Sequence, residues 1–370
     1  MRTNSPFVVV PVSALILVSC LCVAYFLINP LPPRRMVIAT GAPGSIYDTY
    51  SKQYQRILAR SGVNLEIRNS VGALDNLRLL HDVSSGVKAA LTTFSVTKND
   101  DTDSLYSLGG TFDTPIFIFY RSPDPLTVFA QFRGKRLVIG TPGTALRSTI
   151  SDALKATGGW DTSNTLVDLS NVQAIDELIS GRVDVIAIPQ PETVSLEKLL
   201  NASNIRLMNV MQAEAVAKAV PGLKHVILWR GLIDLIRDVP NSNIDLLAFR
   251  NRLLVRNDLH PALQYLLLEA MREIHWAPGP FNTMGEFPAE QPNDLPLSPT
   301  AQAFYRNGPT LWQRYTWFWL SSLIDRIAFF GIPVFVVLIP VVGFAFSLHR
   351  WLYMRRVIAA ERSGLPKLPE

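Results

Sequence analysis

MVIATGAPGSIY, residues 36–47, joins a strand to a helix through a turn rich in glycine. Its first residues form a short β-prone run, and apolar residues then recur at helical spacing as far as Ser61-Gly62. A strand followed by a helix recurs directly afterwards, which favours a parallel sheet with helices on its faces. The predicted elements are strands over 36–40, 65–68 and 87–93 and helices over 46–61 and 74–83.

A second half repeats this pattern after Pro123 and Pro125. A strand over 136–139 leads through the turn GTPGT, residues 140–144, into another predicted helix. Two similar α/β halves in one chain predict two lobes with a cleft between them. Strands over 105–111 and 115–121 interrupt the winding between the halves. We expect lobe 1 over 36–122 and 225–290, lobe 2 over 123–224, and a proline-rich extended arm over 291–326.

Two charge-free apolar runs, 7–28 and 327–348, flank this α/β part. Each is long enough for a helix to cross a hydrocarbon core of about 30 Å. Arginines crowd the tail 349–370, so the C-terminus is predicted to be cytoplasmic and the domain periplasmic, in a bacterial inner membrane. Two spans place both termini on the same side. Arg34 and Arg35, which follow the first run, argue the other way.

The first run has three interpretations: a retained anchor, a lipoprotein signal ending at Cys20, or an ordinary cleaved signal. We favour the anchor because the apolar run continues past Cys20 to Ile28. The sequence has no cysteine other than Cys20 and Cys22, so the domain contains no disulfide. The net charge of +5 is modest and does not indicate nucleic-acid binding.

The sequence shows no catalytic constellation. It contains neither a Gly-x-Ser-x-Gly elbow nor a His-Glu-x-x-His motif, and its five histidines have no metal-ligand spacing. We therefore expect no cofactor and no metal site, and an enzyme is the weakest of the functional hypotheses.

Three predicted helices begin after small residues, at 44–47, 70–73 and 143–148. Helix N-termini present free backbone N–H groups and a positive dipole end, which suit a carboxylate. Arg147 stands one turn into its helix and is placed to add a bidentate contact. Ordinary strand-to-helix turns with a solvated Arg147 are the alternative interpretation.

A resemblance then becomes specific. From Met36 onward the chain resembles solute receptors of the tripartite ATP-independent periplasmic (TRAP) transporters, of the TAXI type, and in particular their membrane-anchored branch. The order of the matching stretches carries the resemblance. They are TGAPGSIY at 40–47, LDNLRLL at 74–80, IFYR at 118–121, RGKR at 133–136, LISGRVD at 178–184, NDLHPAL at 257–263, GEFP at 285–288, QRY at 313–315 and IDR at 324–326.

The resemblance implies an α/β fold of the two-lobed type II periplasmic-binding class, flanked by one N-terminal and one C-terminal transmembrane helix. It implies capture of a small organic anion, a carboxylate or acidic amino acid, for delivery to TRAP permease membrane subunits driven by an ion gradient. Hinges are then expected near 120–125 and 223–228, and the lipid bilayer is a further partner. The expected ligand contacts are Gly44, Ser45, Tyr47, Gly72, Thr144, Arg147 and Gln190.

The chain departs from the family pattern at two turns. Ser45 stands where a second glycine is usual, and Asp48 would repel an anion if it faced the cleft. Ala145 and Leu146 replace residues able to hydrogen-bond a ligand or to let its atoms approach the backbone. An anchored solute-sensing or scaffold module without transport is therefore the alternative function.

Overall fold

The computed structural model describes residues 32–93, 104–291 and 295–308, together with residues 350, 351, 354, 355 and 358. The chain divides into two compact units, one of residues 33–308 and one of residues 1–32 with 309–370. Both predicted membrane spans, 7–28 and 327–348, lie outside the described residues. Among the helices that are described, none combines the length and apolarity that a bilayer requires. In the second unit the Arg355 guanidinium stacks on the Trp351 ring, 4.2 Å from its centroid.

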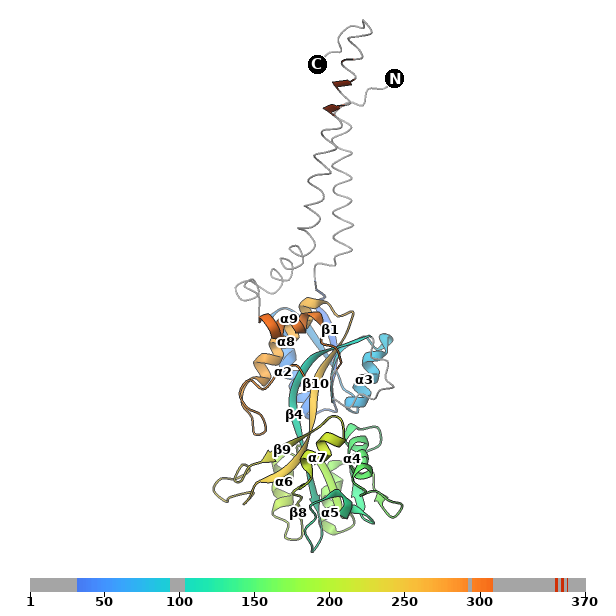
Figure 1. The fold of residues 1–370 in the computed structure, drawn as a ribbon, viewed down its shortest axis with the longest axis vertical. Helices are drawn as coiled ribbons and strands as arrows, with labels where there is room; N and C mark the ends of the chain where they lie inside the picture. Colours follow the sequence, from blue (N-terminus) through green and yellow to red (C-terminus); the bar gives the residue numbers. More distant parts are fainter. Residues whose placement is uncertain are drawn as a thin grey trace. The chain divides into compact units, whose positions relative to one another are not determined.

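The described strands of the unit 33–308 form one ten-stranded sheet (Figure 1). Its order is β2-β1-β3-β10-β4-β7-β5-β6, with β8 added to β4 and β9 added to β10. The strands are β1 (Arg35–Ala39), β2 (Asn64–Arg68), β3 (Val87–Thr93), β4 (Leu105–Tyr120), β5 (Arg136–Val138), β6 (Thr165–Leu166), β7 (Val185–Pro189), β8 (Arg206–Leu207), β9 (Leu223–Leu228) and β10 (Ile244–Arg256).

Lobe 1 is built on β1, β2 and β3, which pair in parallel. This parallel pairing confirms the order predicted from the first half of the sequence, because each strand returns to the sheet through a helix. The core of the lobe includes Leu77, Leu80, Val87 and Leu254. Its helices are α2 (Ile46–Arg60), α3 (Ala73–His81), α8 (Pro261–His275) and α9 (Pro299–Asn307), with a 3-10 turn η1 (Val83–Ser85).

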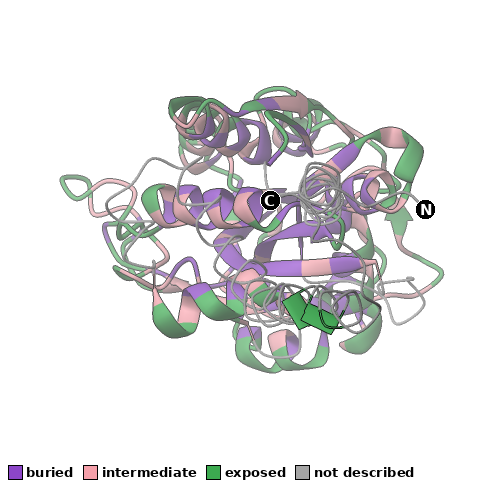
Figure 2. Ribbon diagram, turned by 90° about the horizontal axis from the view of Figure 1, so that it is seen from above, coloured by how far each residue is buried: buried purple, intermediate pink, exposed green. Residues whose placement is uncertain are grey.

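Lobe 2 is built on β5, β6 and β7, which are also parallel. Buried residues of its helices and strands form two clusters on this part of the sheet. Figure 2 shows, for the domain seen from above, that buried residues lie in the strands and on the helix sides that face them. The elements are η2 (Phe129–Phe132), α4 (Ala145–Ala156), α5 (Asn171–Ser180), α6 (Thr193–Leu200) and α7 (Ala213–Ala219).

The end of β4 shows why the lobe-2 sheet has two cores. Ile116, Ile118 and Tyr120 belong to one buried cluster, whereas Phe117 and Phe119 belong to the other. Successive side chains of a strand point to opposite faces, so an unbroken apolar run buries both faces of the sheet. The run therefore fixes a layered helix–sheet–helix arrangement.

Two long strands, β4 and β10, belong to both lobes. The first part of β4 pairs with β10 up to Ile116, and its last part pairs with β7. The N-terminal half of β10 pairs with β9, and its C-terminal half pairs with β3. The lobes are thus joined within these strands, near 113–115 and 249–251. This differs from the hinges expected near 120–125 and 223–228, because both of those segments pack in lobe 2.

The segment that follows α8 covers the edge of β4 in lobe 1. Gly110 exchanges backbone hydrogen bonds with Ala289. The Ser107 N–H donates to the Pro296 carbonyl, and the Ser107 carbonyl accepts from the Ser298 N–H. Gly109 has a φ of +110°, and a Cβ there would meet the Tyr305 hydroxyl at 2.3 Å, so this position requires glycine. The arm expected over 291–326 is therefore attached to β4 along its described residues.

An ion-pair network joins this segment to lobe 2 beside the crossing. Lys224 of β9 lies 2.7 Å from the Asp113 carboxylate and 2.7 Å from that of Glu286. Burial raises the pKa of Asp113, although Lys224 acts in the opposite direction. The network ties β9, β4 and the segment after α8 together.

The buried side chain of His275, the last residue of α8, packs against α2. The His275 ring stacks on Phe112 at 5.4 Å, and its Nε2 lies 2.8 Å from the Tyr54 hydroxyl. Burial lowers the pKa of His275 to about 3. The folded protein therefore holds this ring neutral at neutral and mildly acidic pH.

We predict that the free energy of unfolding falls as the pH drops below about 6.5. The unfolded chain protonates His275 near its ordinary pKa, whereas the folded protein resists protonation down to about 3. The loss should reach about 2 kcal/mol between pH 7.5 and pH 5. Urea denaturation over this range measures it, with His275→Gln expected to flatten the dependence. An unchanged slope in that variant would contradict the assignment.

Candidate functional site

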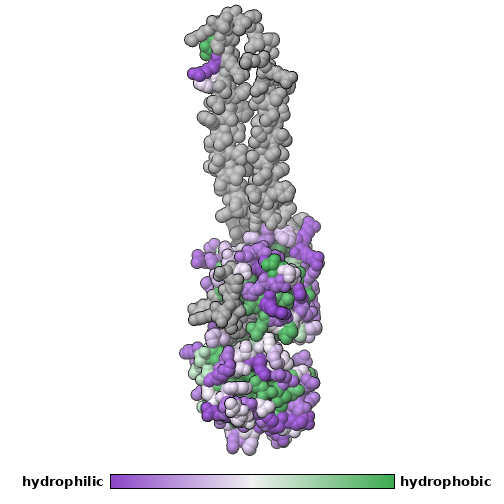
Figure 3. Space-filling view, turned by 90° about the vertical axis from the view of Figure 1, so that its right-hand side faces the viewer, coloured by the Kyte–Doolittle hydropathy of each residue, from purple (hydrophilic) through white to green (hydrophobic). Residues whose placement is uncertain are grey.

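A cavity of about 570 Å³ lies between the two lobes, at the carboxyl ends of the parallel strands. Five helices, α2 to α6, begin at its wall, and residues of β4 and β10 also line it. Ligands of open α/β sheets bind at this edge because the strand-to-helix turns converge there. On the face that Figure 3 shows, hydrophobic side chains lie on both sides of the boundary between the lobes.

The turn before α2 is held by hydrogen bonds between its own residues and those of the first helical turns. Ser45 caps the helix by accepting from the Asp48 N–H. Asp48 accepts from the Gly44 N–H at 2.9 Å and from Lys52 at 2.7 Å. The Lys52 hydrogen bond, together with that of Gly44, holds the pKa of Asp48 below its ordinary value. Asp48 is thus buried in its own turn and does not line the cavity, so the repulsion considered from the sequence does not arise.

Tyr47 and Asn251 form the part of the wall nearest the crossing strands. The Tyr47 hydroxyl donates to Asn251 Oδ1 at 2.6 Å. Asn251 Nδ2 in turn donates to the Thr114 hydroxyl at 2.9 Å and to the Phe112 carbonyl at 3.0 Å. Burial raises the pKa of Tyr47 well above its ordinary value. These bonds fix the start of α2 to β4 and β10.

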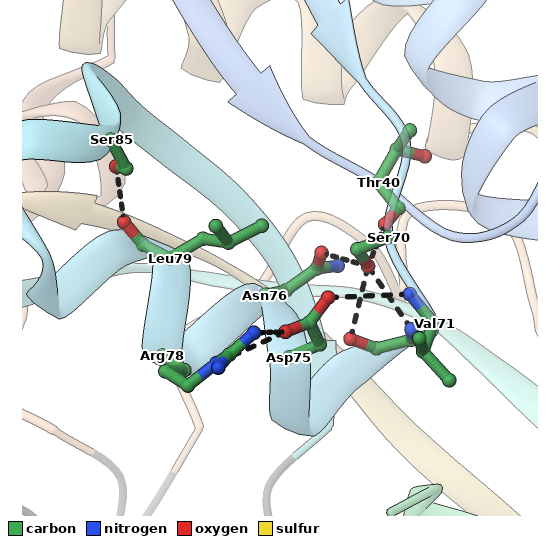
Figure 4. Close-up of polar contacts among 9 residues, drawn as sticks. Thr40, Ser70, Val71, Asp75, Asn76, Arg78, Leu79 and Ser85 are labelled. Atoms are coloured by element: carbon green, nitrogen blue, oxygen red, sulfur yellow. Dashed lines mark hydrogen bonds and ion pairs between the residues drawn. The ribbon is translucent and has the colours of Figure 1, made fainter.

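A second network positions the turn before α3 (Figure 4). The Ser70 hydroxyl lies 2.6 Å from the Thr40 carbonyl oxygen and 2.6 Å from Asn76 Oδ1, and it accepts from the Gly72 N–H at 3.0 Å. Asn76 Nδ2 donates to the Leu91 carbonyl at 2.7 Å. The Ser70 hydroxyl therefore joins the turn to the residue after β1, and the buried Asn76 amide joins it to β3.

The helix starts differ in how they are capped. Side-chain oxygens of Ser45, Thr144 and Ser170 cap α2, α4 and α5. The N-cap residues of α3 and α6 are Gly72 and Glu192, and neither provides a side-chain cap. The first-turn N–H groups of α3, in lobe 1, and of α6, in lobe 2, are therefore left for solvent or a ligand.

The wall carries little charge. Among the described residues that line the cavity, Glu192 is the one Asp, Glu, Lys, Arg or His. The remaining lining side chains are apolar or neutral and polar. An acid group bound here would be held by backbone and hydroxyl donors and by the helix dipoles.

The structure brings most of the sequence-predicted contacts together. Six of the seven line the cavity, and Arg147 does not. Its guanidinium lies 2.8 Å from the Asp168 carboxylate and 3.1 Å from the Gly140 carbonyl oxygen. The six are Gly44, Ser45, Tyr47, Gly72, Thr144 and Gln190.

Sequence reasoning missed the part of the wall that comes from the crossing strands. Thr114 of β4 and Phe249 and Asn251 of β10 lie far in sequence from any helix start. The available signal was polar: Thr114 follows Asp113, and Asn251 stands between Arg250 and Arg252, within strands that are otherwise largely apolar. Glu192 was also missed, because the sequence analysis did not include the start of α6 among the candidate binding turns.

Comparisons with known proteins give one matching family and several solved structures that resemble this chain. The family described as NMT1-like matches residues 38–307. An ancestral arginine-binding protein bound to arginine is 12% identical over 65% of this chain and 92% of its own, with a TM-score of 0.42. The periplasmic aliphatic sulphonate binding protein of Escherichia coli is 16% identical over 65% of this chain and 68% of its own, with a TM-score of 0.41. No curated relative matches the sequence. At these values the structural matches do not indicate a shared ligand.

We predict that Asn76→Leu destabilises the protein by about 2–4 kcal/mol. The substitution leaves the Leu91 carbonyl without its amide donor in a buried setting, and it also removes a partner of Ser70. Urea denaturation measures the effect. Arg78→Ala, on the same helix, removes only an exposed ion pair with Asp75 and should cost less than about 0.5–1 kcal/mol. Equal effects of the two substitutions would refute the role of the buried amide.

We also predict that Arg147→Ala changes the affinity for a bound solute by less than about twofold, because the guanidinium pairs with Asp168 away from the wall. Titration calorimetry of the variant against the wild type measures this. A tenfold loss would show that Arg147 leaves Asp168 for the ligand and restores it as a contact.

Proposed function

Because the chain belongs to the NMT1-like family, we propose that it is a solute-binding receptor for a small organic molecule. The α/β fold of the unit 33–308 is of the periplasmic-binding-protein type, with two lobes and a cavity between them. The observation that carries the proposal is the convergence of five helix starts on that one cavity.

The solute proposed here carries an acid group that is held at the start of α3. Gly72, the N-cap of this helix, has no side chain and leaves open space where a Cβ would stand. Val71, beside it, is 63% exposed and lines the cavity. A carboxylate therefore has access to the N–H groups and positive dipole end of α3. This supports the small organic anion expected from the sequence.

Binding is proposed to close the lobes over the solute. Both connections lie in the paired strands β4 and β10, and the register of this pair shifts between Asn251 and Leu254. Bulges of this kind bend and twist a strand pair locally, so they concentrate a hinge there. A ligand that contacts both lobes binds the closed state more tightly than the open state, and this difference in affinity sets how far binding shifts the protein toward closure.

The more specific proposal is a TAXI-type receptor that serves TRAP permease subunits. It rests on the motif order from Met36 onward and on the apolar runs 7–28 and 327–348. These runs would anchor the chain in the inner membrane, with the domain in the periplasm and both ends in the cytoplasm. The proposed role is capture and delivery, without chemistry on the solute.

We predict that the full chain, purified in detergent, is stabilised by one class of small carboxylates in a thermal-shift panel of dicarboxylates, oxo-acids, amino acids and amines. A ligand present at 100 times its Kd should add about 2.7 kcal/mol to the free energy of unfolding. A panel that gives no shift with a folded sample would favour the scaffold alternative.

The same panel includes a matched pair of variants at the proposed acid site. Val71→Asp places a negative charge beside the start of α3 and should weaken binding of the acid about tenfold. Val71→Asn, of similar size and neutral, should bind within about threefold of the wild type. Equal losses in the two variants would place the acid group elsewhere on the wall.

A further inference from the structure

Among the described residues that line the cavity, Glu192 is the one Asp, Glu, Lys, Arg or His, and an acid group on the solute gives it no binding role. Glu192 follows β7 and stands at the N-cap of α6, on the lobe-2 side of the cavity. A carboxylate at an N-cap commonly accepts from the first-turn N–H groups of its helix. Glu192 makes no such bond, and among the described residues it has no ion-pair partner. Its charge is therefore available to a ligand in the cavity.

The backbone before Glu192 holds it in place. Gln190 stands between Pro189 and Pro191 and has a φ of +38°, which is uncommon for a residue with a side chain. Its N–H donates to the Pro115 carbonyl at 2.8 Å, at the crossing of β4 between the lobes. Strained backbone of this kind persists where surrounding contacts impose it, and it is concentrated at binding sites. The loop is thus fixed to the crossing strand rather than freely mobile.

The charge of the wall then limits the solute. Any solute carrying only negative charge would meet a carboxylate and no cationic side chain among the described lining residues. Much of the remaining wall is apolar, including Leu146, Val172, Ile188 and Phe249. A carboxylate among neutral side chains can form a charge-assisted hydrogen bond with an ammonium group.

We propose that Glu192 binds an ammonium group of the solute, which is therefore a zwitterion with an apolar body, such as an aliphatic or aromatic amino acid. This inference rests on the proposed receptor function. The acid group lies at α3 in lobe 1, and the ammonium group lies at Glu192 in lobe 2. The two charges of one molecule then contact both lobes, so binding favours their closure.

Three probes with one carbon skeleton test the assignment on the full chain in detergent. They are L-leucine, 4-methyl-2-oxopentanoate, which lacks the ammonium group, and 3-methylbutylamine, which lacks the acid. The wild type should bind L-leucine at least tenfold more tightly than either of the others, as measured by titration calorimetry. L-phenylalanine, phenylpyruvate and phenethylamine form a second set with a larger apolar body.

Variants at position 192 separate this role from general stability effects. Glu192→Gln should reduce the preference for the amino acid over the oxo-acid to less than about threefold, and Glu192→Lys should reverse it. Glu197→Gln, on the same helix but not on the cavity wall, should leave the preference unchanged. Glu192→Gln should keep the wild-type melting temperature, because Glu192 is exposed and its side chain does not cap α6.

The outcomes are distinct. Oxo-acids bound as tightly as amino acids by the wild type, or a preference that survives Glu192→Gln, would overturn the inference and leave the receptor proposal standing. Failure of all six probes would also overturn it, whereas the receptor proposal itself depends on the wider panel of carboxylates and amines.

Discussion

The pairing of β4 with β10 is the constraint on which the rest of the structure depends. Each strand continues through both lobes, so its backbone hydrogen bonds must be satisfied by different neighbours at its two ends. The lobes can therefore separate only at the point where the neighbours change. That point fixes where the cavity lies, because the helix starts of lobe 1 and lobe 2 face each other across it. Backbone contacts of Ala289, Pro296 and Ser298 with the β4 edge add to the pairing in lobe 1.

Polar side chains at the crossing connect this constraint to the site. Asn251 of β10 accepts from the Tyr47 hydroxyl at the start of α2. The N–H of Gln190, which follows β7, donates to the Pro115 carbonyl of β4. Each bond joins a loop of one lobe to a strand that belongs to both. Buried polar groups that are fully satisfied in this way specify one geometry, because any displacement leaves a donor or acceptor unpaired. The cavity wall is therefore positioned by hydrogen bonds as much as by the packing of the apolar cores.

The electrostatic character of the site follows from what the wall lacks as much as from what it holds. The starts of α3 and α6 have no side-chain cap. Among the described lining residues, Glu192 is the one Asp, Glu, Lys, Arg or His. Helix dipoles and backbone donors bind an acid more weakly than an arginine would, so selectivity is left to the shape of the apolar wall and to Glu192. Arg147, the cation that family resemblance points to, is paired with Asp168 outside the cavity.

Most of the fold was determined by the sequence. Strands and helices of both halves were predicted close to their observed bounds, because β-prone runs, glycine turns and helical spacing are local properties. The helix-start residues from Gly44 to Thr144 were also found this way. The sequence predicted a break at 112–114, where Asp113 and Thr114 stand at the crossing, whereas β4 continues through it as one strand. The lobe connection, the contacts of Asn251 and the displacement of Arg147 all depend on residues far apart in the chain. Such contacts leave no local pattern, so only the tertiary structure decided them.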